Sequence, residues 1–224
     1  MNKTLSFAKL DFITIKPFLT IKNLLLLLGV ASFLVFGTDS PSATISMVIM
    51  YATMFAVYPF AVGEQNGIDA LYSTLPISRS VVVAGRYLFA VLVNIAAVIL
   101  SFGLTAIVYT ILRREFIIEE MLLTVVVCFS VFVFMQAVQL PFYFKLGYNK
   151  AKIIAYLPLL AFPVCVFILS KLFGSDALIS GLVTIATWIE THVILSFLIL
   201  FAVLLSVLFI SYRISLGYYK KRDF

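Results

Sequence analysis

Length, composition and charge place this chain among integral membrane proteins. Of its 224 residues, 63% are hydrophobic and 12% are charged, whereas a soluble domain has about 25% charged residues. A soluble globule of this size cannot bury that much apolar surface. The long, unbroken apolar runs also exclude a β-barrel, whose strands are short and alternate in polarity. The net charge of +6 matters through its distribution between loops, and we expect no nucleic-acid partner.

The first 17 residues mix apolar and charged side chains and end at a proline. We expect a helix that lies in the inner membrane interface and stops at Pro17, which cannot continue a helix. The apolar face of this helix would comprise Leu5, Phe7, Ala8, Phe12 and Ile15, with Lys3, Lys9, Asp11 and Lys16 elsewhere. The alternative is a disordered tail whose lysines reach the lipid headgroups.

Long apolar stretches follow, and a helix needs about 20 apolar residues to cross the hydrocarbon core. They predict six spans, at residues 18–38, 42–63, 80–112, 121–144, 153–172 and 192–213. A further apolar stretch at 177–189 would form a helix roughly 20 Å long, too short for a core of about 30 Å. We expect it to be a short re-entrant helix before span six. The predicted fold class is an all-α polytopic membrane protein.

The basic residues predict the orientation of these spans. With the N-terminus in the cytoplasm, 13 Lys and Arg residues lie on the inner side and three on the outer side. Because Lys and Arg concentrate in cytoplasmic loops, we expect both termini to be cytoplasmic. A seventh full span would place the basic tail outside and is therefore disfavoured.

The loop between the second and third spans is the most informative part of the sequence. Asn66 and Gly67 form a helix-stop signal, because glycine adopts the left-handed conformation that closes a helix. Asp69 can cap a new short helix, and Pro76 ends it. A short helix bracketed in this way favours docking of a soluble partner on the cytoplasmic face, although an ordinary ordered loop would have the same pattern.

Polar side chains inside the predicted spans are uncharged amides. Asn94 lies in span three, and Gln136 and Gln139 lie three residues apart on span four, so the two glutamines share one face. They could bond neighbouring helices together, or they could line a substrate cavity. No ionisable residue lies in the middle of a span, which weighs against a proton-coupled carrier.

Catalytic and metal-binding motifs are absent from the sequence. The chain has no G-x-x-x-x-G-K-[ST] loop and therefore no phosphate cradle of its own. His192 is the only histidine, which excludes an H-E-x-x-H metal site. We predict no catalytic residue, no metal site and no cofactor in this chain, which we interpret as a non-enzymatic membrane subunit.

The loop after span two resembles the signature of ABC-2 type transporter permeases. Within that family the chain is similar to the small permeases of Gram-positive bacteria, including exporters of phenol-soluble modulin peptides. The residues that carry the resemblance are Glu64, Gly67, Asp69, Leu71, Leu75, Pro76, Ile77, Ser78 and Arg79, followed by Arg86 and Tyr87. In layout the resemblance covers the whole chain, residues 1–224, as a single transmembrane domain.

The resemblance implies a permease half in the bacterial cell membrane, paired with a second permease, identical or different, and with two ATPase subunits. ATP and magnesium would bind to those ATPases, and their closure would push a cytoplasmic coupling helix between spans two and three. The cavity would then close inward and open outward, with amphipathic peptides as the hypothetical cargo. Carried over by position, the ATPase contact would comprise Glu64, Asp69, Leu71, Tyr72, Leu75, Pro76 and Arg79.

A second hypothesis is a membrane sensor or immunity protein that binds a toxic peptide without transporting it. Such a protein would share the composition but would not need the docking helix. Deletion of residues 68–74 would then leave protection intact.

Overall fold

The computed structural model describes residues 3–18, 20–23, 25, 29–30, 32–33, 40–68, 72, 77–113, 117–154, 164, 167–168, 171–172 and 174–222. All regular structure within these ranges is helical. The elements are α1 (Lys3–Ile15), η1 (Lys16–Phe18), α3 (Pro41–Gln65), α5 (Arg79–Ile111), α6 (Ile118–Leu146), α8 (Ser175–Thr191) and α9 (Val193–Lys220).

Four of these helices, α3, α5, α6 and α9, are long and apolar enough to cross a membrane. They overlap the stretches expected to span at 42–63, 80–112, 121–144 and 192–213. The other two expected spans, at 18–38 and 153–172, fall largely outside the described residues. A multi-pass helical membrane protein is therefore established, while the number six stays a prediction.

The ends of α3 and α6 follow from glycines. Helix α3 ends at Gln65 with Asn66 as its C-cap, and Gly67 follows with φ = 65°. Helix α6 ends at Leu146 with Gly147 as its C-cap, where φ is 76°. Both angles lie in the left-handed region, which side chains with a Cβ rarely adopt. The stop signal predicted at Asn66 and Gly67 is thus confirmed.

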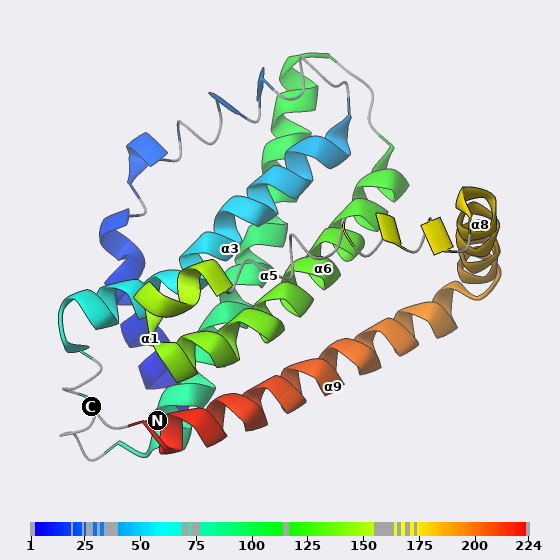
Figure 1. The fold of residues 1–224 in the computed structure, drawn as a ribbon. Helices are drawn as coiled ribbons and strands as arrows, with labels where there is room; N and C mark the ends of the chain where they lie inside the picture. The colour runs from blue at the N-terminus through cyan, green and yellow to red at the C-terminus, as the bar shows by residue number, and fades with distance from the viewer. Residues whose placement is uncertain are drawn as a thin grey trace.

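Helix α5 is the centre of the arrangement (Figure 1). It packs against α3, α1, α9 and α6, while α6 in turn packs against α3 and α9. Helix α9 lies beside the start of α5 near the two chain termini and then runs away from the bundle toward α8 (Figure 1). The chain turns at His192, which is both the C-cap of α8 and the N-cap of α9.

The largest buried cluster lies at the end of the bundle where α5 begins and where α3, α6 and α9 end. We call this region the basic end. Aromatic rings dominate its packing, with Phe144 edge-on to Phe60 and Tyr219, and with Tyr87 edge-on to Tyr212. The basic side chains of this end are Arg79, Lys145, Lys150, Lys152, Lys220, Lys221 and Arg222.

Helix α1 buries a different face from the one expected. Phe7, Ala8 and Ile15 are buried as predicted, but Asp11 is buried with them at 1% exposure. Leu5 and Phe12, expected on the same apolar face, are half exposed. The prediction failed for these three residues because Asp11 has a charged partner inside the bundle.

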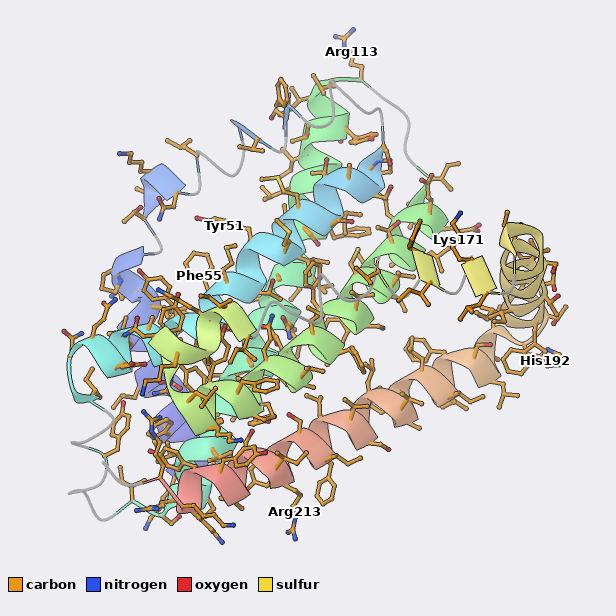
Figure 2. The ribbon with its side chains drawn as sticks, viewed as in Figure 1. Tyr51, Phe55, Arg113, Lys171, His192 and Arg213 are labelled. Atoms are coloured by element: carbon orange, nitrogen blue, oxygen red, sulfur yellow. The ribbon has the colours of Figure 1, made fainter. Side chains whose placement is uncertain are left out.

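Helix α8 covers the stretch expected to form a short helix at 177–189 and is longer, at 17 residues. Such a helix is about 25 Å long, still below the ~30 Å of a membrane core. Its re-entrant placement stays an interpretation. Figure 2 shows Lys171 and His192 near α8. It also shows Arg113 just beyond the C-terminal end of α5, and Arg213 projecting outward from α9.

Candidate functional site

The connection between α3 and α5 is anchored on its first side by Glu64. The Glu64 carboxylate accepts hydrogen bonds from the backbone N–H and the side-chain amide of Asn149, both at 3.1 Å. A Cβ on Gly147 would stand 2.8 Å from Glu64 Oε2 and 3.1 Å from Arg222 Nη2. The positive φ of Gly147 also favours glycine at this close approach. Glu64 thus binds the end of α3 to the helical residues 148–154 that follow α6.

Arg79 anchors the second side of this connection. Its Nη1 donates to the backbone carbonyls of Tyr219 and Lys220, at 3.2 and 2.5 Å. These carbonyls belong to the last turn of α9, where the helix dipole favours a positive charge. Arg79 therefore joins the beginning of α5 to the end of α9.

Tyr72 is the described residue in the middle of the connection, and it points inward. It is 7% exposed, and its ring lies edge-on to Phe7 of α1, with ring centroids 5.0 Å apart. The other expected contact residues, Asp69, Leu71, Leu75 and Pro76, lie outside the described residues. The loop is thus joined to α1, to the helical residues 148–154 and to α9 through three predicted site residues.

A buried ion pair lies behind this loop. Arg86 Nε of α5 is 3.6 Å from Asp11 Oδ2 of α1, and both side chains are almost fully buried. The Arg86 guanidinium also stacks over the Phe60 ring of α3, 4.2 Å from its centroid. One arginine thereby connects α1, α3 and α5. From the sequence, Arg86 is named only in the family resemblance and is assigned no partner.

A signal for this pair exists in the sequence. Asp11 lies four residues from both Phe7 and Ile15, so helical periodicity places it on the same face as these two buried residues. An acid on a buried face needs a charged partner. The neighbouring Gly85 lets α1 approach, because a Cβ there would stand 2.9 Å from Phe7 Cβ.

Hydroxyl groups join α5, α6 and α9 beside the ion pair, since Tyr87 directly follows Arg86 on α5. The Tyr87 hydroxyl lies 2.5 Å from Ser211 Oγ and 2.8 Å from Ser215 Oγ, and Ser211 donates to the Ala137 carbonyl. Ser211 has one hydroxyl proton, which it donates to the Ala137 carbonyl. Tyr87 therefore donates to Ser211 and accepts from Ser215. All four groups are satisfied within the bundle.

The amides expected as possible cavity residues meet each other. Asn94 Nδ2 donates to Gln136 Oε1 at 2.6 Å, and Gln136 Nε2 donates back to Asn94 Oδ1 at 3.1 Å. Both side chains are buried, and Gln139 is buried one turn further along α6. The reciprocal pair links α5 to α6 in the manner of interhelical hydrogen bonds in membranes.

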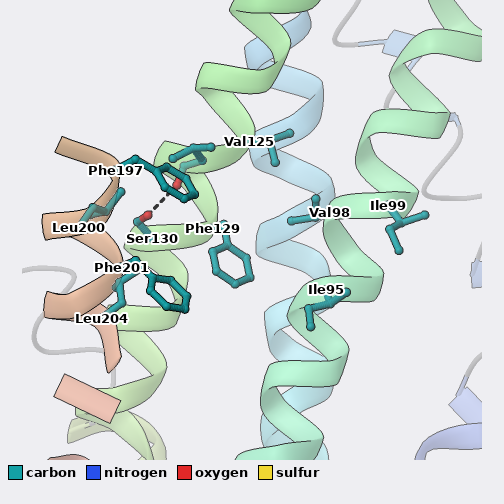
Figure 3. A pocket seen from close by; sticks show the side chains of 11 residues that line it. Ile95, Val98, Ile99, Val125, Phe129, Ser130, Phe197, Leu200, Phe201 and Leu204 are labelled. Carbon is teal, nitrogen blue, oxygen red and sulfur yellow. Dashed lines mark hydrogen bonds between the residues drawn. The ribbon is translucent and has the colours of Figure 1, made fainter. Parts of the chain in front are cut away.

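An apolar cleft of about 270 Å³ lies between α5, α6 and α9, farther from the basic end (Figure 3). Its walls include Ile95 and Val98 of α5, Phe129 of α6, and Phe197, Phe201 and Leu204 of α9. Ser130 is its polar side chain, and the Ser130 hydroxyl donates to the Val126 carbonyl of its own helix. The cleft therefore presents an apolar surface, and Asn94, Gln136 and Gln139 do not line it. Sequence reasoning missed these wall residues, since their apolar side chains look like those that face lipid.

Within the described part of the chain, no three His, Cys, Asp or Glu side chains gather as a metal site. The described side chains join the helices at the basic end, and an apolar cleft lies between α5, α6 and α9 farther along.

Comparison with known proteins agrees with these features. The family model described as ABC-2 family transporter protein matches residues 7–220. No curated protein and no solved structure matches the chain significantly. The match covers almost the whole chain, so the chain belongs to the ABC-2 family of transporter proteins and is a membrane permease component that works with an ABC ATPase.

Proposed function

We propose that this chain is the permease half of a bacterial exporter that moves amphipathic peptides out of the cell by alternating access. In this proposal six spans cross the plasma membrane, including residues 18–38 and 153–172, and both termini are cytoplasmic. A second permease completes the pathway. ATP and magnesium bind to the ATPase subunits.

The observation that carries the proposal is the triple attachment of the connection between α3 and α5. Glu64 joins it to the helical residues 148–154, Tyr72 joins it to α1, and Arg79 joins it to α9. A displacement of this connection by an ATPase would reach three other elements at once. A loop attached only to its own two helices would transmit far less.

The same contacts suggest a division of roles among the seven predicted contact residues. Glu64, Tyr72 and Arg79 are engaged inside the chain, so we assign them to holding the coupling segment in place. Asp69, Leu71, Leu75 and Pro76 are then the proposed surface for the ATPase. The segment between Gly67 and Ile77 would form the coupling helix.

The apolar cleft supports a hydrophobic or amphipathic cargo. Its walls have no charged side chain, and an amphipathic helix presents an apolar stripe that such a surface can accept. The Asn94–Gln136 pair then serves helix packing, and cargo contact falls to the cleft walls. Peptide is the cargo class we propose.

The coupling role is tested by reversing one charge on the proposed contact surface. We expect a neighbouring reading frame to encode the P-loop ATPase. The full chain would be co-expressed with that ATPase and purified with an affinity tag on the chain. We expect Asp69→Arg to lower co-purification of the ATPase about ten-fold, as the loss of ~1.4 kcal/mol of contact energy would. Glu119→Lys, an exposed acid in the first turn of α6, is the matched control and should leave co-purification unchanged.

The transport role is tested in proteoliposomes that contain the complete complex. ATP-dependent uptake of a fluorescent amphipathic helical peptide into inside-out vesicles is expected, and deletion of residues 68–74 should abolish it. If cells carrying the deletion stay protected against such a peptide, the chain acts as a sensor or immunity protein and the exporter proposal is wrong.

A further inference from the structure

A second apolar hollow lies between α1 and α5, away from the cleft. It measures about 570 Å³ and is lined on α1 by Leu5, Lys9 and Phe12, and on α5 by Phe89, Leu92 and Ala96. None of these residues takes part in the ion pair or in the loop contacts described above. The hollow therefore has no role in the proposed coupling.

The residues that line this hollow carry a net positive charge. Lys9 is the charged residue among those that line it, and none of them is acidic. The nearest acid on α1 is Asp11, which is buried and paired with Arg86. The Lys9 ammonium is exposed, so it can meet an anion at the mouth of the hollow.

The surroundings of the hollow are those of a helix lying on lipid. Helix α1 exposes Leu10 and Ile13 besides Leu5 and Phe12, each at 43% or more, together with Lys3, Lys9 and Lys16. Apolar and basic side chains on one short helix are typical of binding in the membrane interface. From Phe89 to Ala96 the hollow extends roughly 10 Å along α5, which is most of the ~15 Å hydrocarbon depth of one leaflet.

We propose that this hollow binds an anionic phospholipid. One acyl chain lies along Phe89, Leu92 and Ala96 of α5 and beneath Phe12 of α1. The phosphate lies at the Lys9 ammonium. The bound lipid fills the gap between α1 and α5 and holds α1 against the bundle, in addition to the Asp11–Arg86 pair. This site needs neither ATP nor cargo, so it stands or falls independently of the transport proposal.

The test uses the purified full-length chain in lipid nanodiscs and two photoreactive lipids. A phosphatidylglycerol with a diazirine in one acyl chain is compared with the corresponding phosphatidylcholine, and labelled peptides are identified by mass spectrometry. We expect phosphatidylglycerol to label α1 and the 89–96 segment of α5 about five-fold more than phosphatidylcholine, the preference that one lysine near an anionic surface produces.

Variants decide whether the site is the hollow itself. Lys9→Gln should bring the ratio of the two lipids to about one, whereas Lys9→Arg should keep the preference. Lys150→Gln, a matched exposed lysine at the basic end, should leave the ratio unchanged. Ala96→Trp should fill the hollow and lower labelling by both lipids.

Two results would overturn the proposal. Equal loss of preference in Lys9→Gln and Lys150→Gln would mean a diffuse attraction to the basic end. Undiminished labelling in Ala96→Trp would mean that the label comes from lipid surrounding the helices and not from the hollow. Folding of each variant is checked by size-exclusion chromatography, because loss of a stabilising lipid by itself lowers the melting temperature.

Discussion

Helices α5, α6 and α9 are joined differently at their two halves. Near the basic end, Tyr87, Ser211 and Ser215 bond across the helices, and aromatic rings fill the space between them. About 15 Å farther along α9, the apolar cleft separates the same helices, and α9 has exposed apolar side chains such as Ile194, at 79%. Directional bonds tie α9 to α5 and α6 near the basic end, whereas apolar side chains of all three helices line the cleft farther along.

The difference has a mechanical consequence. Buried hydrogen bonds and ion pairs have one favourable geometry, because a displaced partner leaves a desolvated polar group. Apolar contacts are non-directional and can slide at little cost. A tilt of α9 would therefore pivot at the basic end and change the width of the cleft. The predictions below test this contrast, from the largest expected effect to the smallest.

The largest effect is expected from the ion pair. Arg86→Ala leaves the Asp11 carboxylate buried without its charged partner, which should lower stability by about 3–5 kcal/mol. Thermal unfolding in detergent would measure the loss. The double variant Asp11→Leu with Arg86→Met should recover most of it, because no isolated charge remains.

Arg213→Ala is the control for this prediction, since Arg213 projects away from the bundle (Figure 2). Its effect should be small. If Arg86→Ala cost no more than Arg213→Ala, the basic end would not be held by this pair.

The next effect concerns the close approach of α1 to α5. In Gly85→Ala the new Cβ would meet Phe7 atoms at 2.6–2.9 Å, which should destabilise the chain by about 1–3 kcal/mol. Gly103→Ala is matched on the same helix and has no atom within 4 Å of the new Cβ. It should be neutral or stabilising by up to about 1 kcal/mol. Limited proteolysis of α1 would separate the two outcomes, and equal cleavage of both variants would contradict the prediction.

A smaller effect is expected at the reciprocal amide pair. Asn94→Leu should cost about 1 kcal/mol, the usual size of an interhelical hydrogen bond in a membrane. The double variant Asn94→Leu with Gln136→Leu should restore stability, since neither amide is left alone. Thermal unfolding and peptide transport should be measured together. If the double variant were stable but did not transport peptide, the result would indicate that Asn94 and Gln136 contact the cargo.

The smallest effect on stability is expected at the cleft. Ile95→Trp fills the cleft from a partly exposed wall position and should change stability by no more than about 0.5 kcal/mol. Peptide uptake into proteoliposomes should nevertheless fall several-fold, because the cargo surface is blocked. Ile107→Trp, exposed on the same helix outside the cleft, should leave uptake unchanged. Equal uptake by both variants would show that the cleft does not hold cargo.

Much of the local structure could be read from the sequence. Asn66 and Gly67 predicted the end of α3, and the charge-free stretches predicted α3, α5, α6 and α9 to within a few residues at most ends. Such features depend on neighbouring residues and on the conformational freedom of glycine. The site stays a prediction: Glu64, Tyr72 and Arg79 are expected to contact a partner, and the structure shows what each contacts inside the chain.

By itself, the sequence determined that this is a helical membrane protein with a distinctive loop after its second predicted span, because hydropathy and helix breakers act locally along the chain. Only the tertiary structure decided that Arg86 meets Asp11, that Asn94 meets Gln136 across 42 residues, and that Arg79 caps α9 across 140 residues. These pairings depend on which helix faces pack together. A periodic pattern shows that a face is buried, and the packed bundle determines what that face is buried against.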